Sequence, residues 1–142
     1  MTSSSHSSKA TRVHDKLLLD THVALWVAAS PQRIGRKATN GILAASDVAI
    51  SSISIAEMGI KAMLGKLKKP DDLVQRLLDA GYSMMDFSVV AAAEVERFGT
   101  LVRHDPFDRL ILAQASASGY SLVTADSTLL AQGFDFVIDA GE

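Results

Sequence analysis

Short apolar segments alternate with longer stretches of helical spacing along this chain. Residues 16–20 (KLLLD), 48–51 (VAIS) and 121–124 (SLVT) are dominated by apolar or small side chains, and similar candidates lie at 82–87 and 136–138. Strands that lack a polar face belong in a parallel sheet covered by helices on both sides. The sequence therefore predicts an α/β fold, a three-layer α/β/α arrangement with a mostly parallel central sheet.

Helices are predicted between these strands from apolar spacing and from residues that start or stop a helix. Ser54 and Glu57 match the S-x-x-E capping box, which predicts a helix running to about residue 64. Asp105 and Pro106 are favoured at the N-cap and the first position of a helix, and Gly119 is placed to end it. The other predicted helices cover residues 21–30, 34–46, 71–80 and 88–101.

The length and composition limit the kinds of protein that this chain can be. At 142 residues it is long enough for one domain with its own core. We expect a flexible Ser-rich tail at residues 1–15, followed by a single domain at residues 16–142. The absence of Cys excludes disulfides and thiolate metal sites.

The net charge of −2 is close to neutral and favours no particular partner. A protein that binds nucleic acid through a broad basic surface is usually more positive, whereas an enzyme that holds phosphates through a metal need not be. No apolar run approaches the roughly 20 residues of a membrane span. The N-terminal segment also lacks the apolar region of a secretory signal. We therefore expect a cytoplasmic protein without a membrane partner.

Four acidic residues from distant parts of the chain stand beside predicted strand ends or helix starts. Asp20 ends the first strand, and Asp126 lies two residues beyond the fourth. Glu57 falls in the first turn of the helix that follows the second strand. Ligands bind outside the carboxyl ends of parallel strands, so these three belong at one edge of the sheet by topology. Asp108 joins them only if its own helix also starts at that edge.

Each of these acids also has a simpler interpretation, because acids are favoured at helix N-termini by roughly 0.3–1 kcal/mol. That interpretation weakens for the set, since two unit charges about 4 Å apart repel by roughly 4 kcal/mol at an effective dielectric near 20. A bound divalent cation, or protons held at raised pKa, would have to offset the repulsion. With oxygen ligands, no Cys and few His, the expected ion is Mg²⁺ or Mn²⁺.

At these segments the chain resembles the PIN-domain family, and within it the VapC-type toxin ribonucleases. That family's first strand and first acid correspond to LLLDTHVALW, its second-acid segment to SSISIAEMGIK, and its third- and fourth-acid segments to HDPFDRLILAQA and LVTAD. The resemblance extends over nearly all of residues 16–138. It implies a shared set of catalytic, metal-binding acids, namely Asp20, Glu57, Asp108 and Asp126.

Further polar residues lie beside these acids. Thr124 matches the small hydroxyl residue that often precedes the family's last acid, and it is an auxiliary candidate for the metal. Asp105 is expected to cap its helix, and is the second auxiliary candidate. Relatives with a DPFDR segment often have a His two residues before it, where this chain has Arg103. His104 is adjacent to Asp105 instead and is assigned no role.

The resemblance implies a metal-dependent endoribonuclease, a phosphodiester hydrolase in which Mg²⁺ or Mn²⁺ activates water for attack on RNA. It also implies the toxin role in a VapBC-type toxin–antitoxin system. The implied partners are the RNA substrate, a VapB-type antitoxin and a second copy of the chain in a homodimer.

Two alternative functions stay open at this point. The first is a receiver-like phospho-acceptor signalling module, which needs an acid pair near the first strand and a Lys ending a late one. Asp20 stands alone after its strand, and Thr124 is followed by Ala125 and Asp126. The second is a non-catalytic PIN-like binding domain, against which the presence of all four acids counts.

Basic side chains near the acids have two interpretations each. Arg103 and Arg109 flank the third acid and would either hold a phosphate or pair with a carboxylate. A basic run also follows Glu57, for which a solvated face is the simpler interpretation and an RNA-steering patch the second. This run consists of Lys61, Lys66, Lys68 and Lys69.

Overall fold

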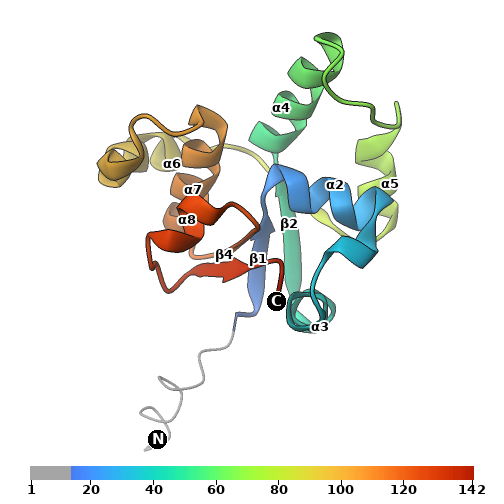
Figure 1. Ribbon diagram of the computed structural model, residues 1–142, viewed down its shortest axis with the longest axis horizontal. Helices are drawn as coiled ribbons and strands as arrows, with labels where there is room; N and C mark the ends of the chain where they lie inside the picture. The colour runs from blue at the N-terminus through green and yellow to red at the C-terminus, as the bar shows by residue number, and fades with distance from the viewer. Residues whose placement is uncertain (1–13) are drawn as a thin grey trace, which may run out of the picture.

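The computed structural model describes residues 14–142, and its centre is a five-stranded parallel sheet (Figure 1). The strands lie in the order β3-β2-β1-β4-β5, and every neighbouring pair is parallel. This confirms the predicted α/β fold. The strands are β1 (Lys16–Leu19), β2 (Asp47–Ser51), β3 (Ser83–Met85), β4 (Ser121–Thr124) and β5 (Val137–Asp139).

Helices cover both faces of the sheet, and each face has its own apolar core. Leu17 and Leu19 belong to the first core, whereas Leu18 belongs to the second, because successive side chains of a strand face opposite sides. The first face carries α2 (Thr21–Ala29), the short 3₁₀ helix η2 (Pro31–Arg33), α3 (Arg36–Ala44) and α5 (Leu73–Asp79). The second carries α6 (Val89–Glu94), the 3₁₀ segment η3 (Val95–Leu101), α7 (Pro106–Ser118) and α8 (Ser127–Ala131).

Helix α4 (Ser52–Met63) follows β2 without a loop and extends beyond the carboxyl edge of the sheet (Figure 1). It contacts both α2 and α7, and its Met58 is buried in the first core. The helix therefore borders the carboxyl edge and projects the side chains of its outer turns past that edge.

The order of the strands reverses between β1 and β4. From β1 the chain builds outward through β2 to β3, and it then returns to place β4 on the other side of β1. Leu19 of β1 pairs with Val123 of β4, so the two strands end side by side. Such a switch point is where open parallel sheets bind their ligands, and here Asp20 and Asp126 follow the two strands that form it.

The predicted capping box at Ser54 and Glu57 is wrong. Ser51 caps α4 instead, and its side-chain oxygen accepts a hydrogen bond from the backbone N–H of Ile53 at 2.9 Å. Because the last residue of β2 also serves as the cap, the helix begins three residues earlier than the S-x-x-E pattern indicates. Glu57 thus lies in the second turn of α4, where its side chain is free of any capping role.

The predicted helix at 88–101 is interrupted. Its first part is α6 and its second is η3, inside which Phe98 has a non-helical backbone with φ −109° and ψ 44°. The Phe98 ring is buried in the second core and meets the Phe134 ring edge-on at 5.4 Å. The sequence predicted one continuous helix here and missed this break, which lies at a residue in contact with a distant part of the chain.

The start and end of α7 are confirmed as predicted. Asp105 accepts a hydrogen bond from the backbone N–H of Phe107 at 2.8 Å, and Pro106 occupies the first turn. Gly119 ends the helix at a left-handed φ of 74°, a conformation that glycine adopts without steric cost.

The predicted tail falls mostly on residues 1–13, which lie outside the described residues. His14 and Asp15 are described, and both contact residues at or just before the starts of strands. The ring of His14 lies 2.6 Å from the Ser121 hydroxyl, and Asp15 accepts hydrogen bonds from Ser46. Within residues 14–142 no helix has both the length and the apolar character needed to cross a membrane.

Candidate metal centre

The four predicted acids gather at the carboxyl edge of the sheet. Helix α7 runs back along the sheet toward the start of β4, so its first turn, which carries Asp108, lies at that edge. The charges of Asp20, Glu57 and Asp126 all act on the Asp108 carboxyl, as does that of Asp105. The helix that carries Asp108 therefore starts at the same edge as the other three acids.

The pKa of Asp108 is raised at this crowded and partly buried edge. Burial, together with the negative charges of Asp105, Asp20, Asp126 and Glu57, raises the pKa of its carboxyl from 3.8 to about 7. Like charges held together in a partly buried site disfavour ionisation. Near neutral pH this edge therefore holds either a proton or a cation.

Asp20 is both a helix cap and a buried site residue. Its Oδ1 accepts a hydrogen bond from the backbone N–H of Val23 at 2.9 Å, and its Oδ2 accepts one from the Thr124 hydroxyl. Burial raises the pKa of Asp20, against the lowering effect of these two hydrogen bonds. The capping interpretation and the site interpretation are thus compatible for this residue, because its two oxygens serve different partners.

Thr124 joins the two acids of the switch point. Its hydroxyl oxygen donates to Asp20 and accepts a hydrogen bond from the backbone N–H of Asp126 at 3.0 Å. Asp126 in turn caps α8, with its Oδ1 accepting from the backbone N–H of Leu129 at 3.0 Å. Thr124 therefore orients both acids through one side chain.

Glu57 is held from two sides. Its Oε1 lies 2.6 Å from the Thr21 hydroxyl, and its Oε2 lies 2.7 Å from the Lys61 ammonium. The side chain is 2% exposed. A charge buried to this degree is stable only when it is paired and hydrogen-bonded, and Thr21 and Lys61 meet that requirement.

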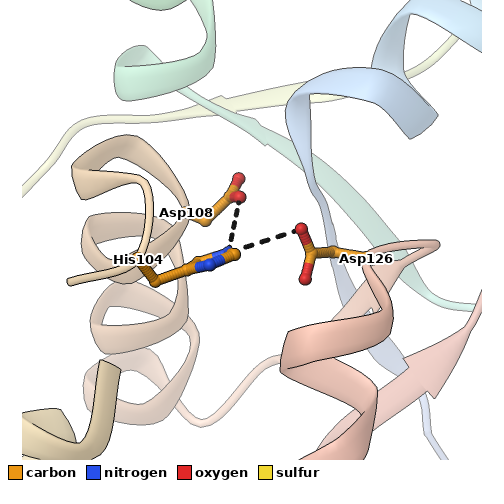
Figure 2. A group of neighbouring side chains, drawn as sticks. All are labelled: His104, Asp108 and Asp126. Carbon is orange, nitrogen blue, oxygen red and sulfur yellow. Dashed lines mark hydrogen bonds and ion pairs between the residues drawn. The ribbon is translucent and has the colours of Figure 1, made fainter. Parts of the chain in front are cut away.

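His104 is the site residue that the sequence prediction left out. Figure 2 shows its ring between Asp108 and Asp126, with Nε2 3.2 Å from an oxygen of Asp108 and 3.4 Å from one of Asp126. His104 lies in the loop before α7, so it was judged by its distance from the family's usual His position. Its spacing of four residues from Asp108 was the available signal.

The donor atoms of this edge fit a divalent cation. One ligand atom from each of His104, Asp108 and Asp126 lies within 4.8 Å of the other two. Carboxylate oxygens suit Mg²⁺ and Mn²⁺, and imidazole nitrogen suits transition metals. Asp20 and Glu57 lie further back and already accept hydrogen bonds on both oxygens, although a carboxylate oxygen has a second lone pair for another partner.

The two arginines near the acids differ in their surroundings. Arg109 donates from one terminal nitrogen to the backbone carbonyls of Leu101 at 3.0 Å and Val102 at 2.8 Å. It therefore ties the end of η3 to α7 rather than facing the acids. Arg103 is exposed in the loop between these elements.

The comparisons with known proteins identify the family of the chain. Residues 17–134 match the PIN domain family. Ribonuclease VapC22 of Mycobacterium tuberculosis is 31% identical over 115 residues, which span 80% of this chain and 88% of that protein. The chain belongs to the PIN-domain family, and within that family to the VapC type.

Solved structures show the same fold at lower identity. The structure of VapBC2 from Rickettsia felis bound to a promoter DNA fragment contains a chain with 21% identity and a TM-score of 0.62, over 87% of this chain and 96% of that one. A chain of the DNA-bound VapBC structure from Salmonella typhimurium has 19% identity and a TM-score of 0.58, over 87% and 96%.

The receiver-like alternative conflicts with the topology. Receiver modules share the flavodoxin-like strand order 2-1-3-4-5, whereas this sheet has the order β3-β2-β1-β4-β5. The switch point consequently falls between β1 and β4 rather than between β1 and β3. The acids of this chain are arranged around that different point.

Proposed function

We propose that this protein is a metal-dependent endoribonuclease that hydrolyses RNA phosphodiester bonds, and that it is the toxin of a VapBC-type toxin–antitoxin system. Similarity to a relative named as a ribonuclease supports the activity. The observation that carries the proposal is the convergence of Asp20, Glu57, Asp108 and Asp126 at the sheet's switch point, where burial and the neighbouring negative charges raise the pKa of Asp108 to about 7. A site with this much negative charge is suited to a cation and through it to a phosphate.

Asp108 and Asp126 would hold the cation directly, together with His104. Asp20 and Glu57 would add their negative charges to the site, and Thr124 and Asp105 would be auxiliary groups. Mg²⁺ or Mn²⁺ suits the carboxylates, and the imidazole of His104 favours Mn²⁺ of the two. When bound, such an ion polarises a phosphoryl group and makes water a better nucleophile at neutral pH.

The protein's own contribution is the orientation of these ligands. The Thr124 hydroxyl donates a hydrogen bond to the Asp20 carboxylate and accepts one from the backbone N–H of Asp126, and so holds both residues. Thr21 and Lys61 fix Glu57, and the cap at Asp105 fixes the first turn of α7 that carries Asp108. Ligands held in advance in this way do not have to be ordered when the substrate binds.

We further propose a VapB-type antitoxin and a second copy of the chain as partners, and the cytoplasm as the location. Support comes from the VapBC toxin–antitoxin complexes among the structural neighbours, including VapBC-5 of Mycobacterium tuberculosis with 21% identity and a TM-score of 0.53 over 86% of this chain and 94% of that one. Size measurements on the protein alone and with a co-expressed antitoxin test this part.

The activity is tested by incubating the purified protein with a mixed pool of single-stranded RNA. We expect cleavage with Mn²⁺ or Mg²⁺, no cleavage in excess chelator, and no cleavage by Asp108→Asn under any metal. Equal cleavage by both proteins would reveal a contaminating nuclease or a wrong site. A folded protein that cuts nothing would support the non-catalytic binding domain instead.

A further inference from the structure

Lys61 lies beside Glu57, one of the acids at the carboxyl edge of the sheet. It stands four residues after Glu57 on α4, on the same face of the helix, and its Nζ is 2.7 Å from Glu57 Oε2. Four residues of helix rise by about 6 Å, and α4 points away from the sheet (Figure 1). A chain approaching the acids from solvent would meet the ammonium group before it reaches Glu57.

The two members of this ion pair differ in their exposure. The Glu57 side chain is 2% exposed, whereas that of Lys61 is 34% exposed. Glu57 therefore acts as a buried anchor, and the lysine as an open charge at the rim of the site.

Lys61 also has unused donors. Its one hydrogen bond to the described residues goes to Glu57, and an ammonium group has three hydrogens to donate. Two of them are available to an acceptor outside the protein. By contrast, His104 is engaged with Asp108 and Asp126, and Arg109 with backbone carbonyls.

The ammonium group of Lys61 places a positive charge beside the acids of the carboxyl edge. Within residues 14–142 it is the only lysine or arginine in an ion pair with one of the four acids. A positive charge beside a cation site would attract the anionic groups that flank the reacting phosphate.

We propose that Lys61 is a substrate-binding residue of this site, which holds a backbone phosphate of the bound RNA chain while Glu57 anchors its ammonium group. The inference rests on the proposed ribonuclease function and adds a residue to it. Lys61 touches the substrate next to the acids and leaves the reaction itself to them. Replacing Lys61 should therefore weaken RNA binding.

The test compares Lys61→Met, which keeps much of the apolar stem, with Lys61→Arg, which keeps the charge. Lys37→Met is the matched control, because it removes the same charge from α3, at the opposite end of the molecule from α4 (Figure 1). For each variant we would measure KM and kcat on a single-stranded RNA, RNA affinity at several salt concentrations in the Asp108→Asn background, and Mn²⁺ affinity without RNA.

For Lys61→Met we expect a rise in KM and a loss of RNA affinity of about tenfold, in addition to any fall in kcat that follows from loosening Glu57. The slope of log affinity against log salt should fall by about 0.7, as for the loss of one phosphate contact to a single strand. Lys61→Arg should recover most of the affinity, and Lys37→Met should match the wild type. Lys61→Gln provides a second neutral variant if Lys61→Met does not fold.

Unchanged affinity and salt slope in Lys61→Met would overturn the inference, and so would a loss confined to kcat and Mn²⁺ affinity, since that would make Lys61 a support for Glu57 alone. In both cases the wild type still cuts RNA, and the proposed function stands. If the wild type neither cuts nor binds RNA, the proposed function fails and this inference fails with it.

Discussion

Carboxylates at the two edges of the central sheet have opposite environments and opposite pKa shifts. At the amino edge, Asp47 accepts hydrogen bonds from the hydroxyls of Tyr120 and Ser83, and these lower its pKa. At the carboxyl edge, Asp108 is surrounded by other acids, and burial together with their charges raises its pKa to about 7. An acid supplied with hydrogen-bond donors is stable as a carboxylate, whereas an acid surrounded by more acids favours a proton or a cation. We propose that this contrast separates a structural carboxylate from a functional one in the same sheet.

The largest expected effect comes from removing the charge at the crowded edge. Asp108→Asn should abolish metal-dependent RNA cleavage, because it removes one of the proposed cation ligands. Without metal it should fold as well as the wild type or slightly better, since one member of a repelling set is gone. Cleavage assays and denaturant unfolding in chelator check the two parts. Wild-type cleavage by Asp108→Asn would make Asp108 an ordinary first-turn acid.

The pH dependence of stability should differ between the two edges. Asp108 has a folded pKa of about 7 against an ordinary value of 3.8, so between these values the folded state binds more protons than the unfolded state. Its contribution to the free energy of unfolding is therefore present at low pH and is lost as the pH rises through about 7. Each pKa unit corresponds to about 1.4 kcal/mol.

For Asp47 the sign is reversed, because its folded pKa is lowered and its contribution is lost as the pH falls below about 4. Denaturant unfolding of the metal-free protein across this range, with Asp108→Asn as the reference, isolates the Asp108 part. A wild-type curve parallel to that of Asp108→Asn between about pH 4 and 7 would contradict the crowding of the carboxyl edge.

A smaller effect should follow from loosening the acids without removing them. Thr124→Val deletes the hydroxyl that bonds to Asp20 and to the backbone of Asp126, while it keeps the shape of the side chain. Loss of such a supporting group costs roughly 10- to 100-fold in metal affinity or activity. We expect a fall of about tenfold in cleavage rate at fixed Mn²⁺, partly restored at higher Mn²⁺. A rate equal to that of the wild type would show that the acids are held without Thr124.

The smallest effect is expected at the amino edge. Asp47→Asn weakens the hydrogen bonds from Tyr120 and Ser83 and should cost about 1 kcal/mol of stability, with RNA cleavage unchanged. It is the counterpart of Asp108→Asn, which should change activity and spare stability. Thermal unfolding and the cleavage assay together check the pair. A loss of cleavage in a fully folded Asp47→Asn would break the distinction between the edges.

Much of the fold could be predicted from local sequence. The strand at 121–124 has its predicted limits, and the Asp105 cap and the Gly119 stop of α7 are as predicted. These features depend on neighbouring residues alone. The start of α4 was wrong because Ser51 and Ser54 are both good caps, and the pairing of β2 within the sheet decides between them.

The candidate site was predicted in part for the same reason. Strand ends and switch-point topology brought Asp20, Asp126 and Glu57 together, and the position of α7 added Asp108. The place of His104 between two of these acids depends on the path of the loop from η3 to α7, which no local pattern describes. The ion pair of Lys61 with Glu57 has helical spacing, but its position at the rim follows only from the direction of α4.

We propose that the carboxyl edge is a cation site and that the amino edge is not. The decisive measurement is calorimetric titration of Mn²⁺ into the metal-free protein, beside Asp108→Asn and Asp47→Asn. We expect saturable binding by the wild type and by Asp47→Asn, with binding lost or strongly weakened in Asp108→Asn. Equal Mn²⁺ binding by all three proteins, or by none of them, would contradict it.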